Sequence, residues 1–249
     1  WTGARAQQRT ADGVMIERAG STIEVSCRVI IGADGPQSTV GGWIHRQNTD
    51  FMDAAQVEVV LARPDTLAHV YFAPEIRGGY GWLFPKGETA NLGAGTSRRI
   101  GGDPGRALAF LLDRLQGEVG AIVSHTGGVV PVGGPVDGLV HGNVMLVGDA
   151  AGQTHAITGA GIFAAVSAGV LAGSAAAEAI VADRMDLLMR YQEEWDDFMT
   201  ASLCHAKARR SFLETQWSND PDELSEVIRY TWIAFREYWK SRATDAADG

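Results

Sequence analysis

Short apolar runs separated by turns fill the first hundred residues and predict β-strands. The runs at 14–17, 23–25 and 28–31 predict a small hairpin followed by a buried strand. Further runs of the same kind, punctuated by Pro and Gly, predict an antiparallel sheet. These runs lie at 56–61, 68–72, 80–84 and 91–95.

Helical spacing appears later in the chain. A helix is predicted over 103–116, with Asp103 as its N-cap, and the apolar run at 129–132 is expected to return to the sheet. A buried strand is predicted at 144–147, and a long helix of small residues follows at about 159–182.

The rest of the chain is predicted to be helical. A second helix start is marked by Asp220 and Pro221, and the tail at 241–249 is expected to be frayed. Large side chains recur at helical spacing, which is more typical of a core than of a functional site. They are Leu188, Tyr191, Trp195 and Phe198.

Composition narrows the classes of protein. The chain has 249 residues, of which 45% are hydrophobic, so it can bury one large core or two modest ones. Its net charge of -9 disfavours a nucleic-acid partner, because such binding needs a clustered cationic surface. Residues 150–177 contain no charged side chain, which raises the question of a membrane span. Since Gly and Ala dominate there, a buried helix packed on a sheet is favoured.

The remaining features of the composition concern location and metals. Cys27 and Cys204 are far apart and suggest neither a disulfide framework nor a zinc site, so a reducing cytoplasm fits best. The six histidines show no metal-binding spacing, and no metal is expected. No signal peptide is visible. Because residue 1 is Trp, we expect the chain to begin partway through a longer gene product.

Candidate chemistry begins at the end of the strand at 144–147. Gly148 and Asp149 follow it directly, where a carboxylate is unexpected unless it receives hydrogen bonds. Asp149 can accept hydroxyl groups of a ribose or ribitol, while small residues such as Ala150 let a large ligand approach the backbone. The alternative is that Asp149 caps the following turn.

The segment TGAGI at 158–162 tips this balance. It predicts a helix start with exposed backbone N–H groups and the positive end of the helix dipole. Such an end stabilises the negative charge that develops around N1 and the C2 carbonyl of a reduced flavin. The candidate contacts to the flavin ring are Gly159, Ala160, Gly161 and Ile162.

Three motifs together carry a family resemblance. LVGDAAG at 146–152, followed by TGAGI, resembles the second FAD motif of the flavoprotein superfamily that contains aromatic hydroxylases and geranylgeranyl reductases. IGADGPQSTV at 31–40 resembles the DG motif of that superfamily. YGWLFPKG at 80–87 resembles the YxWxFP motif of the geranylgeranyl reductase branch.

The resemblance implies an α/β (α+β) fold, with a partial FAD-binding Rossmann-like domain, an inserted antiparallel-sheet substrate domain and a C-terminal helical region. Residues 1–50 would belong to the FAD-binding domain and carry the DG motif. Residues 51–130 would form the substrate domain, residues 131–183 would complete the FAD-binding domain, and residues 184–249 would form the helical region.

The resemblance also assigns roles to residues. It places Asp34 and Gly35 near the pyrophosphate of FAD, and by themselves these residues also fit a plain strand-to-helix turn in which Ser38 caps the next helix. On a strand, every second side chain shares a face, so an aromatic wall for an apolar substrate is expected. Ordinary sheet packing is the alternative for any one of its members. The expected substrate residues are Tyr80, Trp82, Phe84 and Pro85.

The chain departs from the family pattern in three respects. Ala156 stands where the reductases usually have proline, and Gly41 stands where an Arg often follows the DG motif. The GxGxxG segment that binds the ADP half of FAD is expected upstream of Trp1.

His155 could contact the flavin or donate a proton, although a loop histidine facing solvent is favoured, and no proton donor is assigned.

The function implied is FAD-dependent reduction of double bonds in an apolar, isoprenoid-type substrate of lipid biosynthesis. NAD(P)H or ferredoxin is the expected electron donor. The expected location is cytoplasmic, with peripheral membrane association through a lipid substrate as an option, and the oligomeric state is left open. Two alternatives stay open: a flavin-dependent aromatic monooxygenase, and a non-catalytic truncated chain or partner subunit.

Overall fold

The structure is a computed structural model that describes residues 1–240, so the tail at 241–249 lies outside the described residues. The chain divides into two compact units. The first consists of residues 1–50 and 131–207, and the second of residues 51–130 and the chain from 208 onward. Each unit is described by itself.

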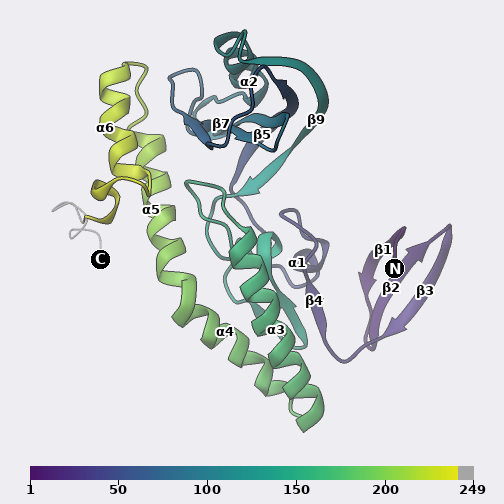
Figure 1. The fold of residues 1–249 in the computed structure, drawn as a ribbon. Helices are drawn as coiled ribbons and strands as arrows, with labels where there is room; N and C mark the ends of the chain where they lie inside the picture. The colour runs from purple at the N-terminus through teal and green to yellow at the C-terminus, as the bar shows by residue number, and fades with distance from the viewer. Residues whose placement is uncertain (241–249) are drawn as a thin grey trace. The chain divides into compact units, whose positions relative to one another are not determined.

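The first unit is built on two small sheets (Figure 1). Its strands are β1 (Ala4–Arg9), β2 (Gly13–Arg18), β3 (Ser21–Ser26), β4 (Ile30–Gly32), β10 (Val140–His141) and β11 (Val144–Leu146). β1, β2 and β3 form an antiparallel sheet, whereas the second sheet has the order β10-β11-β4. All three residues of β11 are fully buried, which confirms the predicted buried strand. β1 was not predicted, because its sequence ARAQQR is almost entirely polar.

Helices complete the first unit. They are α1 (Thr39–Trp43), η2 (Gly148–Ala151), α3 (Ile162–Ala182), η3 (Met185–Leu188), α4 (Met189–Trp195) and η4 (Asp196–Thr200). α3 begins at Ile162 and not at 159, because Gly159 has a φ of +67° that a right-handed helix cannot contain. Tyr191 and Trp195 of α4 are fully buried in the core of this unit, as their spacing predicts.

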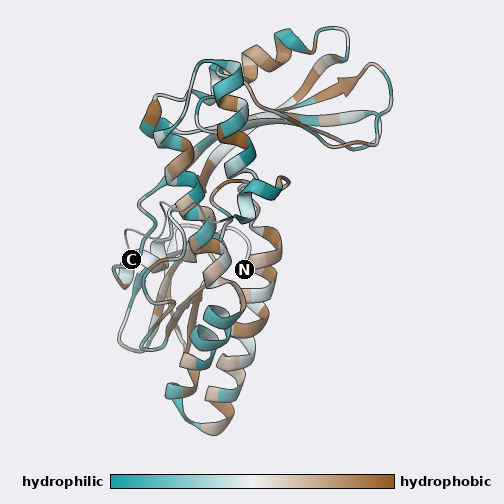
Figure 2. Ribbon diagram, turned by 90° about the vertical axis from the view of Figure 1, so that its left-hand side faces the viewer, coloured by the Kyte–Doolittle hydropathy of each residue, from teal (hydrophilic) through white to brown (hydrophobic). Residues whose placement is uncertain are grey.

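The long helix α3 is buried on one face only. Its alanines, among them Ala164, Ala168 and Ala172, belong to the same core as β11, whereas Val166 and Val170 are exposed. Brown and pale residues predominate along α3 in Figure 2. The helix is long and apolar enough to cross a membrane by length and composition, and 33% of its apolar stretch is buried. The expected packing of this helix on the core around β11 is present, but it buries only the alanine face of α3.

The second unit contains a five-stranded sheet with the order β6-β7-β8-β5-β9. Its strands are β5 (Phe51–Leu61), β6 (His69–Tyr71), β7 (Tyr80–Pro85), β8 (Thr89–Thr96) and β9 (Val119–Pro131). The pairs of β7 with β6 and β8, and of β8 with β5, are antiparallel, as the sequence predicts. β9 is far longer than the predicted run at 129–132. The prediction missed most of the strand because its residues are largely exposed, so they do not alternate between apolar and polar as a half-buried strand does.

Helix α2 (Pro104–Arg114) covers one face of this sheet. Ala107, Leu108 and Leu111 of α2 join the buried side chains of β5, β7 and β8 in one core. Asp103 accepts hydrogen bonds from two backbone N–H groups at the start of α2, which confirms the predicted cap. The opposite face of the sheet carries Trp82 and is considered below.

The C-terminal region is helical, as expected. α5 (Ala201–Thr215) spans the boundary between the two units, and α6 (Pro221–Thr231) and η5 (Arg236–Trp239) follow. Asp220 caps α6 through the N–H groups of Asp222 and Glu223. The caps that the sequence predicts at Ser38, Asp103 and Asp220 are all present.

Trp82 provides a test of the packing in the second unit. It faces Gly93 across the β7–β8 pair, and a Cβ at Gly93 would come within 2.4 Å of the indole ring. We expect Gly93→Ala to lower the free energy of unfolding by about 1–3 kcal/mol, because the indole must move. Gly128→Ala is the control, since a Cβ there meets no atom within 4 Å. Equal effects of the two substitutions in denaturant unfolding would contradict this packing.

Candidate functional site

The two motif loops leave the same edge of one sheet. β4 and β11 are parallel neighbours, and their register pairs Leu146 with Gly32. A Cβ at Gly32 would lie 2.7 Å from the Leu146 side chain and 2.8 Å from that of Val40, so this position has room only for glycine. The carboxyl ends of parallel strands meet at one edge, and Asp34 and Asp149 therefore leave adjacent strands there.

The carboxylate of Asp34 is used by its own loop. It accepts a hydrogen bond of 2.6 Å from the Ser38 hydroxyl and bonds of 2.7 and 3.1 Å from the N–H groups of Thr39 and Val40. Ser38 in turn caps α1, as predicted. Gly35, with a φ of +85°, makes the tight turn between them. Any ligand contact at this segment would therefore use the turn itself more than the Asp34 carboxylate.

The carboxylate of Asp149 has the opposite character. It accepts no hydrogen bond from any residue that the structure describes, although the side chain is partly buried. This burial raises the pKa of Asp149, since the charged form loses water without gaining a partner. The carboxylate does not cap the following turn, so its oxygens are available to hydroxyl groups of a ligand.

Asp149 lies beside the start of α3. A Cβ at Gly161 would be 3.2 Å from the carboxylate oxygen Oδ1 of Asp149 and 2.7 Å from Cγ2 of Thr154. Gly161 is the N-cap of α3, and no side chain caps this helix. The first backbone N–H groups of a 21-residue helix are thus left for another acceptor. Ala160 is exposed, and the side chain of Ile162 is 85% exposed.

A buried network of hydrogen bonds, which the sequence did not reveal, fixes the loop after β11. The N–H of Gly148 donates to Oε1 of Gln153 (2.7 Å), and Nε2 of Gln153 donates to the hydroxyl of Tyr191 (2.9 Å). That hydroxyl donates to the carbonyl of Leu146 (2.7 Å). Burial raises the pKa of Tyr191, so the hydroxyl keeps its proton. Gln153 and Tyr191 therefore hold the backbone on which Asp149 is mounted.

The loop before α3 is closed on itself. The N–H of His155 donates to the carbonyl of Ala160, and the N–H of Gly159 donates to the carbonyl of His155. Ala156, at the position where proline is usual, is fully buried. These two backbone bonds keep the loop closed without the proline.

His155 is partly buried, so the expectation that it faces solvent was wrong. Its Nδ1 accepts a hydrogen bond of 3.3 Å from the N–H of Thr158. Burial, followed by the proximity of His205, lowers the pKa of His155 to about 4. The ring is therefore neutral at neutral pH.

Asn48 joins the two motif loops directly, and no sequence signal pointed to it. Its amide nitrogen donates to the carbonyl of Pro36 at 2.9 Å and to the carbonyl of Asp149 at 2.8 Å. Its Oδ1 lies 2.7 Å from where a Cβ of Gly152 would be, and Gly152 has a φ of +67°. One side chain thus sets the spacing between the DG motif at 31–40 and the loop at 148–152, which is called the GD segment here.

The aromatic residues of β7 lie in the second unit and share one face of the sheet. The rings of Tyr80 and Trp82 are 5.6 Å apart, and those of Trp82 and Phe84 are stacked at 6.3 Å. Trp82 is anchored by a 2.9 Å hydrogen bond from its Nε1 to Oε1 of Gln56. Trp232, which the sequence analysis did not single out, packs edge-on against Tyr80 at 4.8 Å.

This face is open to ligands only in part. Burial raises the pKa of Tyr80 to about 12, whereas Phe84 is 39% exposed. Pro85 ends β7 opposite Ala90. The aromatic stripe therefore runs from a half-buried end at Tyr80 to an exposed end at Phe84.

The structure brings most of the candidate residues of the first unit into one place. Gly148, Asp149 and the turn at 159–161 lie at the start of α3, and the loop with Asp34 and Gly35 is tied to Asp149 through Asn48, whereas Ala150 is fully buried. Across residues 1–240, no group of three or more His, Cys, Asp or Glu side chains is placed to hold a metal ion.

Sequence comparison identifies related proteins. No model of a known protein family matches the chain. Digeranylgeranylglycerophospholipid reductase 1 of Methanopyrus kandleri is 35% identical over 248 residues, which cover 91% of this chain and 66% of that protein. The chain thus spans slightly less than two thirds of the length of that relative.

Solved structures show the same fold. A geranylgeranyl bacteriochlorophyll reductase-like protein of Thermoplasma acidophilum aligns with a TM-score of 0.75 at 22% identity, over 93% of this chain and 66% of that protein. A probable FAD-dependent monooxygenase of Pseudomonas aeruginosa aligns with a TM-score of 0.59 at 21% identity, over 90% of this chain and 66% of that protein. At these identities the two likenesses concern the fold alone.

Asn48 offers a direct test of the link between the loops. We expect Asn48→Ala to lower the free energy of unfolding by about 1–3 kcal/mol, because the carbonyls of Pro36 and Asp149 lose their donor. Thr49→Ala is the matched control, since Thr49 is exposed and its hydroxyl makes no hydrogen bond within residues 1–240. Denaturant unfolding of both variants measures the difference, and equal values would count against the link.

Proposed function

We propose that this chain, which belongs to the geranylgeranyl reductase family, forms the flavin-ring and substrate part of an FAD-dependent enzyme that reduces double bonds of an isoprenoid lipid. One observation carries the proposal. A partly buried carboxylate without a hydrogen-bond donor, that of Asp149, lies against Gly161 at the uncapped start of α3.

These residues fit the ribityl and ring end of FAD. The Asp149 carboxylate can accept hydrogen bonds from ribityl hydroxyls, and Gly161 leaves the space that a Cβ would otherwise fill. The free N–H groups at the start of α3 suit the N1 and C2-carbonyl side of the ring, where negative charge develops on reduction. The network of Gln153 and Tyr191 would keep this backbone in place while the charge changes.

The chemistry would come from the cofactor and the geometry from the protein. Bound FAD would supply the redox chemistry: two electrons from a donor would reduce it, and hydride for one carbon of the substrate double bond would come from its reduced form, with a proton added to the other carbon. The chain's own residues would orient the ring and exclude water. NAD(P)H or ferredoxin as donor is part of the proposal, as is an ADP-binding segment in the part of the relatives that this chain does not span.

The aromatic face of β7 is the proposed substrate wall. Tyr80, Trp82 and Phe84 form a continuous apolar stripe that suits a polyisoprenoid chain, and Pro85 ends it. The hydrogen bond from Trp82 to Gln56 fixes the central indole, so the stripe is ready for substrate without rearrangement.

Asp149→Ala tests the cofactor site. In the full-length protein we expect the affinity for FAD to fall roughly tenfold, as for the loss of a hydrogen bond to a charged group. Flavin absorbance after gel filtration and a fluorescence titration would measure the loss. Asp12→Ala is the control, because Asp12 is an exposed carboxylate of the same unit that accepts no side-chain hydrogen bond.

A second variant separates binding from folding. Asp149→Asn should raise the stability of the flavin-free protein at pH 7, because a carboxylate with a raised pKa disfavours the folded state above that pKa. The gain should disappear as the pH falls and the wild-type carboxylate becomes protonated. Unchanged FAD affinity in both variants would remove Asp149 from the proposed site.

Trp82→Ala tests the substrate wall. We expect kcat/KM for double-bond reduction to fall about tenfold or more, because the substrate loses an aromatic contact, while FAD affinity is retained. Trp82→Phe should restore most of the activity. An equal loss of turnover and flavin binding would contradict the assignment of Trp82 to the substrate wall.

The assay itself separates the alternatives. Reduction of the substrate without oxygen supports a reductase, whereas oxygen-dependent hydroxylation would indicate a monooxygenase. Absence of bound flavin in the full-length protein would indicate a non-catalytic chain.

A further inference from the structure

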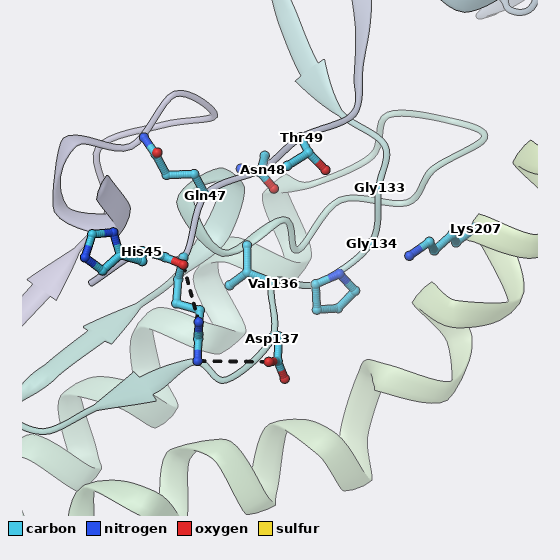
Figure 3. A pocket seen from close by; sticks show the side chains of 11 residues that line it. His45, Gln47, Asn48, Thr49, Gly133, Gly134, Val136, Asp137 and Lys207 are labelled. Carbon is cyan, nitrogen blue, oxygen red and sulfur yellow. Dashed lines mark hydrogen bonds and ion pairs between the residues drawn. The ribbon is translucent and has the colours of Figure 1, made fainter. Parts of the chain in front are cut away.

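A polar cavity of about 330 Å³ lies in the first unit, between the segment that follows α1 and the loop that follows β9 (Figure 3). This volume is at the lower end of the range for small-molecule sites, so it suits a small polar group and not a lipid chain. The residues that matter for its chemistry are Arg46, Asn48, Gly133, Gly134, Asp137 and Lys207.

The cavity is cationic in a chain whose net charge is -9. Arg46 and Lys207 line it, and Asp137 is its only acidic lining residue. The pair between Arg46 and Asp137 has a separation of 4.0 Å, and the Asp137 side chain is 99% exposed. The attraction within such an exposed ion pair is weak, so Asp137 neutralises the positive charge of Arg46 only in small part.

Lys207 is held over the cavity without a counter-charge. Its Cδ lies 3.3 Å from where a Cβ of Gly134 would be, so its stem rests on the glycine loop. Figure 3 shows the side chain extending from its helix toward Gly134. Within residues 1–240, no carboxylate lies within ion-pair distance of Lys207.

The loop beneath Lys207 adds backbone donors. The N–H groups of Gly133 and Gly134 donate to no group in the part of the chain that the structure describes, whereas the neighbouring Val132 and Val136 N–H groups are bonded. Gly134 has a φ of +80°. Free N–H groups in a glycine turn are a recurrent feature of anion sites.

We propose that this cavity binds the phosphate group of a small phosphate ester. The residues that line this polar space carry an ammonium group, a guanidinium group and two free N–H groups, and this donor set matches the oxygens of phosphate. Apart from Asp137 at the rim, no lining group is negatively charged.

A ligand bound in this cavity would affect the neighbouring loop at 148–152, where the flavin ring is proposed to bind. Asn48 lines the cavity and donates to the carbonyl of Asp149, and the carbonyl of Gly134 lies 2.3 Å from where a Cβ of Gly152 would be. A ligand in the cavity would thus contact Asn48, which is hydrogen-bonded to the GD segment. The ester is either the phosphate headgroup of the lipid substrate or a phosphate of a nicotinamide donor, and this choice, together with the bound flavin used in the titration, rests on the proposed function.

Titration of the flavin-loaded, full-length protein with inorganic pyrophosphate tests the site, because bound FAD keeps the probe out of the cofactor's own phosphate site. We expect Lys207→Gln to raise the Kd in calorimetry about tenfold. Arg5→Gln is the control, since it removes one exposed positive charge from the same unit outside the cavity. Equal Kd values for these two variants, or no binding to the wild type, would overturn the proposal.

Asp137→Asn gives a test of opposite sign. Removing the carboxylate should lower the Kd for pyrophosphate about two- to threefold. The wild-type Asp137 carboxylate repels the anion and competes with it for Arg46. Weaker binding by this variant would contradict the site. Pyrophosphate should also perturb the visible spectrum of the bound flavin, and Asn48→Ala should abolish this perturbation.

Competition identifies the source of the phosphate. Displacement of pyrophosphate by glycerol 1-phosphate supports the lipid headgroup, and displacement by NADPH supports the donor. Displacement by neither would overturn the assignment to an ester. Because none of these titrations requires turnover, they can fail while double-bond reduction is still observed, and they can succeed while it is not.

Discussion

The parallel pairing of β4 with β11 is the constraint on which the candidate site depends. It places the ends of two strands from distant parts of the chain at one sheet edge. Glycine is needed at position 32, because a side chain there would collide with those of Leu146 and Val40. The remaining site contacts, including the bridge from Asn48 to the carbonyls of Pro36 and Asp149, are possible only because these loops start side by side.

At this edge the two aspartates have different tasks because their surroundings differ. Asp34 accepts hydrogen bonds from a hydroxyl and two N–H groups, so its charge is satisfied within the fold. Asp149 receives none and its pKa is raised by burial, which costs stability unless a ligand supplies donors. The uncapped start of α3 carries a related cost. Two unsatisfied groups of opposite polarity beside one glycine are the physical basis of the proposed cofactor site.

The second unit separates packing from candidate function by the two faces of its sheet. Gly81, Leu83 and Leu92 face the helix α2, whereas Tyr80, Trp82 and Phe84 lie on the other face. Alternation along a strand makes this separation automatic once one face is buried. Gly93 on the neighbouring strand then allows the indole of Trp82 to lie flat against the sheet.

The sequence by itself determined the local features: the strands and their breaks, the caps at Ser38, Asp103 and Asp220, and the ordered motifs that mark the family. These follow from neighbouring residues and from periodicity. Only the tertiary structure revealed the roles of Asn48, Gln153 and Tyr191, the closed loop around His155 and the polar cavity lined by Arg46 and Lys207. The hydrogen bonds of Asn48, Gln153 and Tyr191 and the packing around the cavity connect residues far apart in the chain, so no local sequence pattern predicts them. The segment that resembles a flavin motif was visible in the sequence, but the free carboxylate that makes it a candidate site was decided by folding.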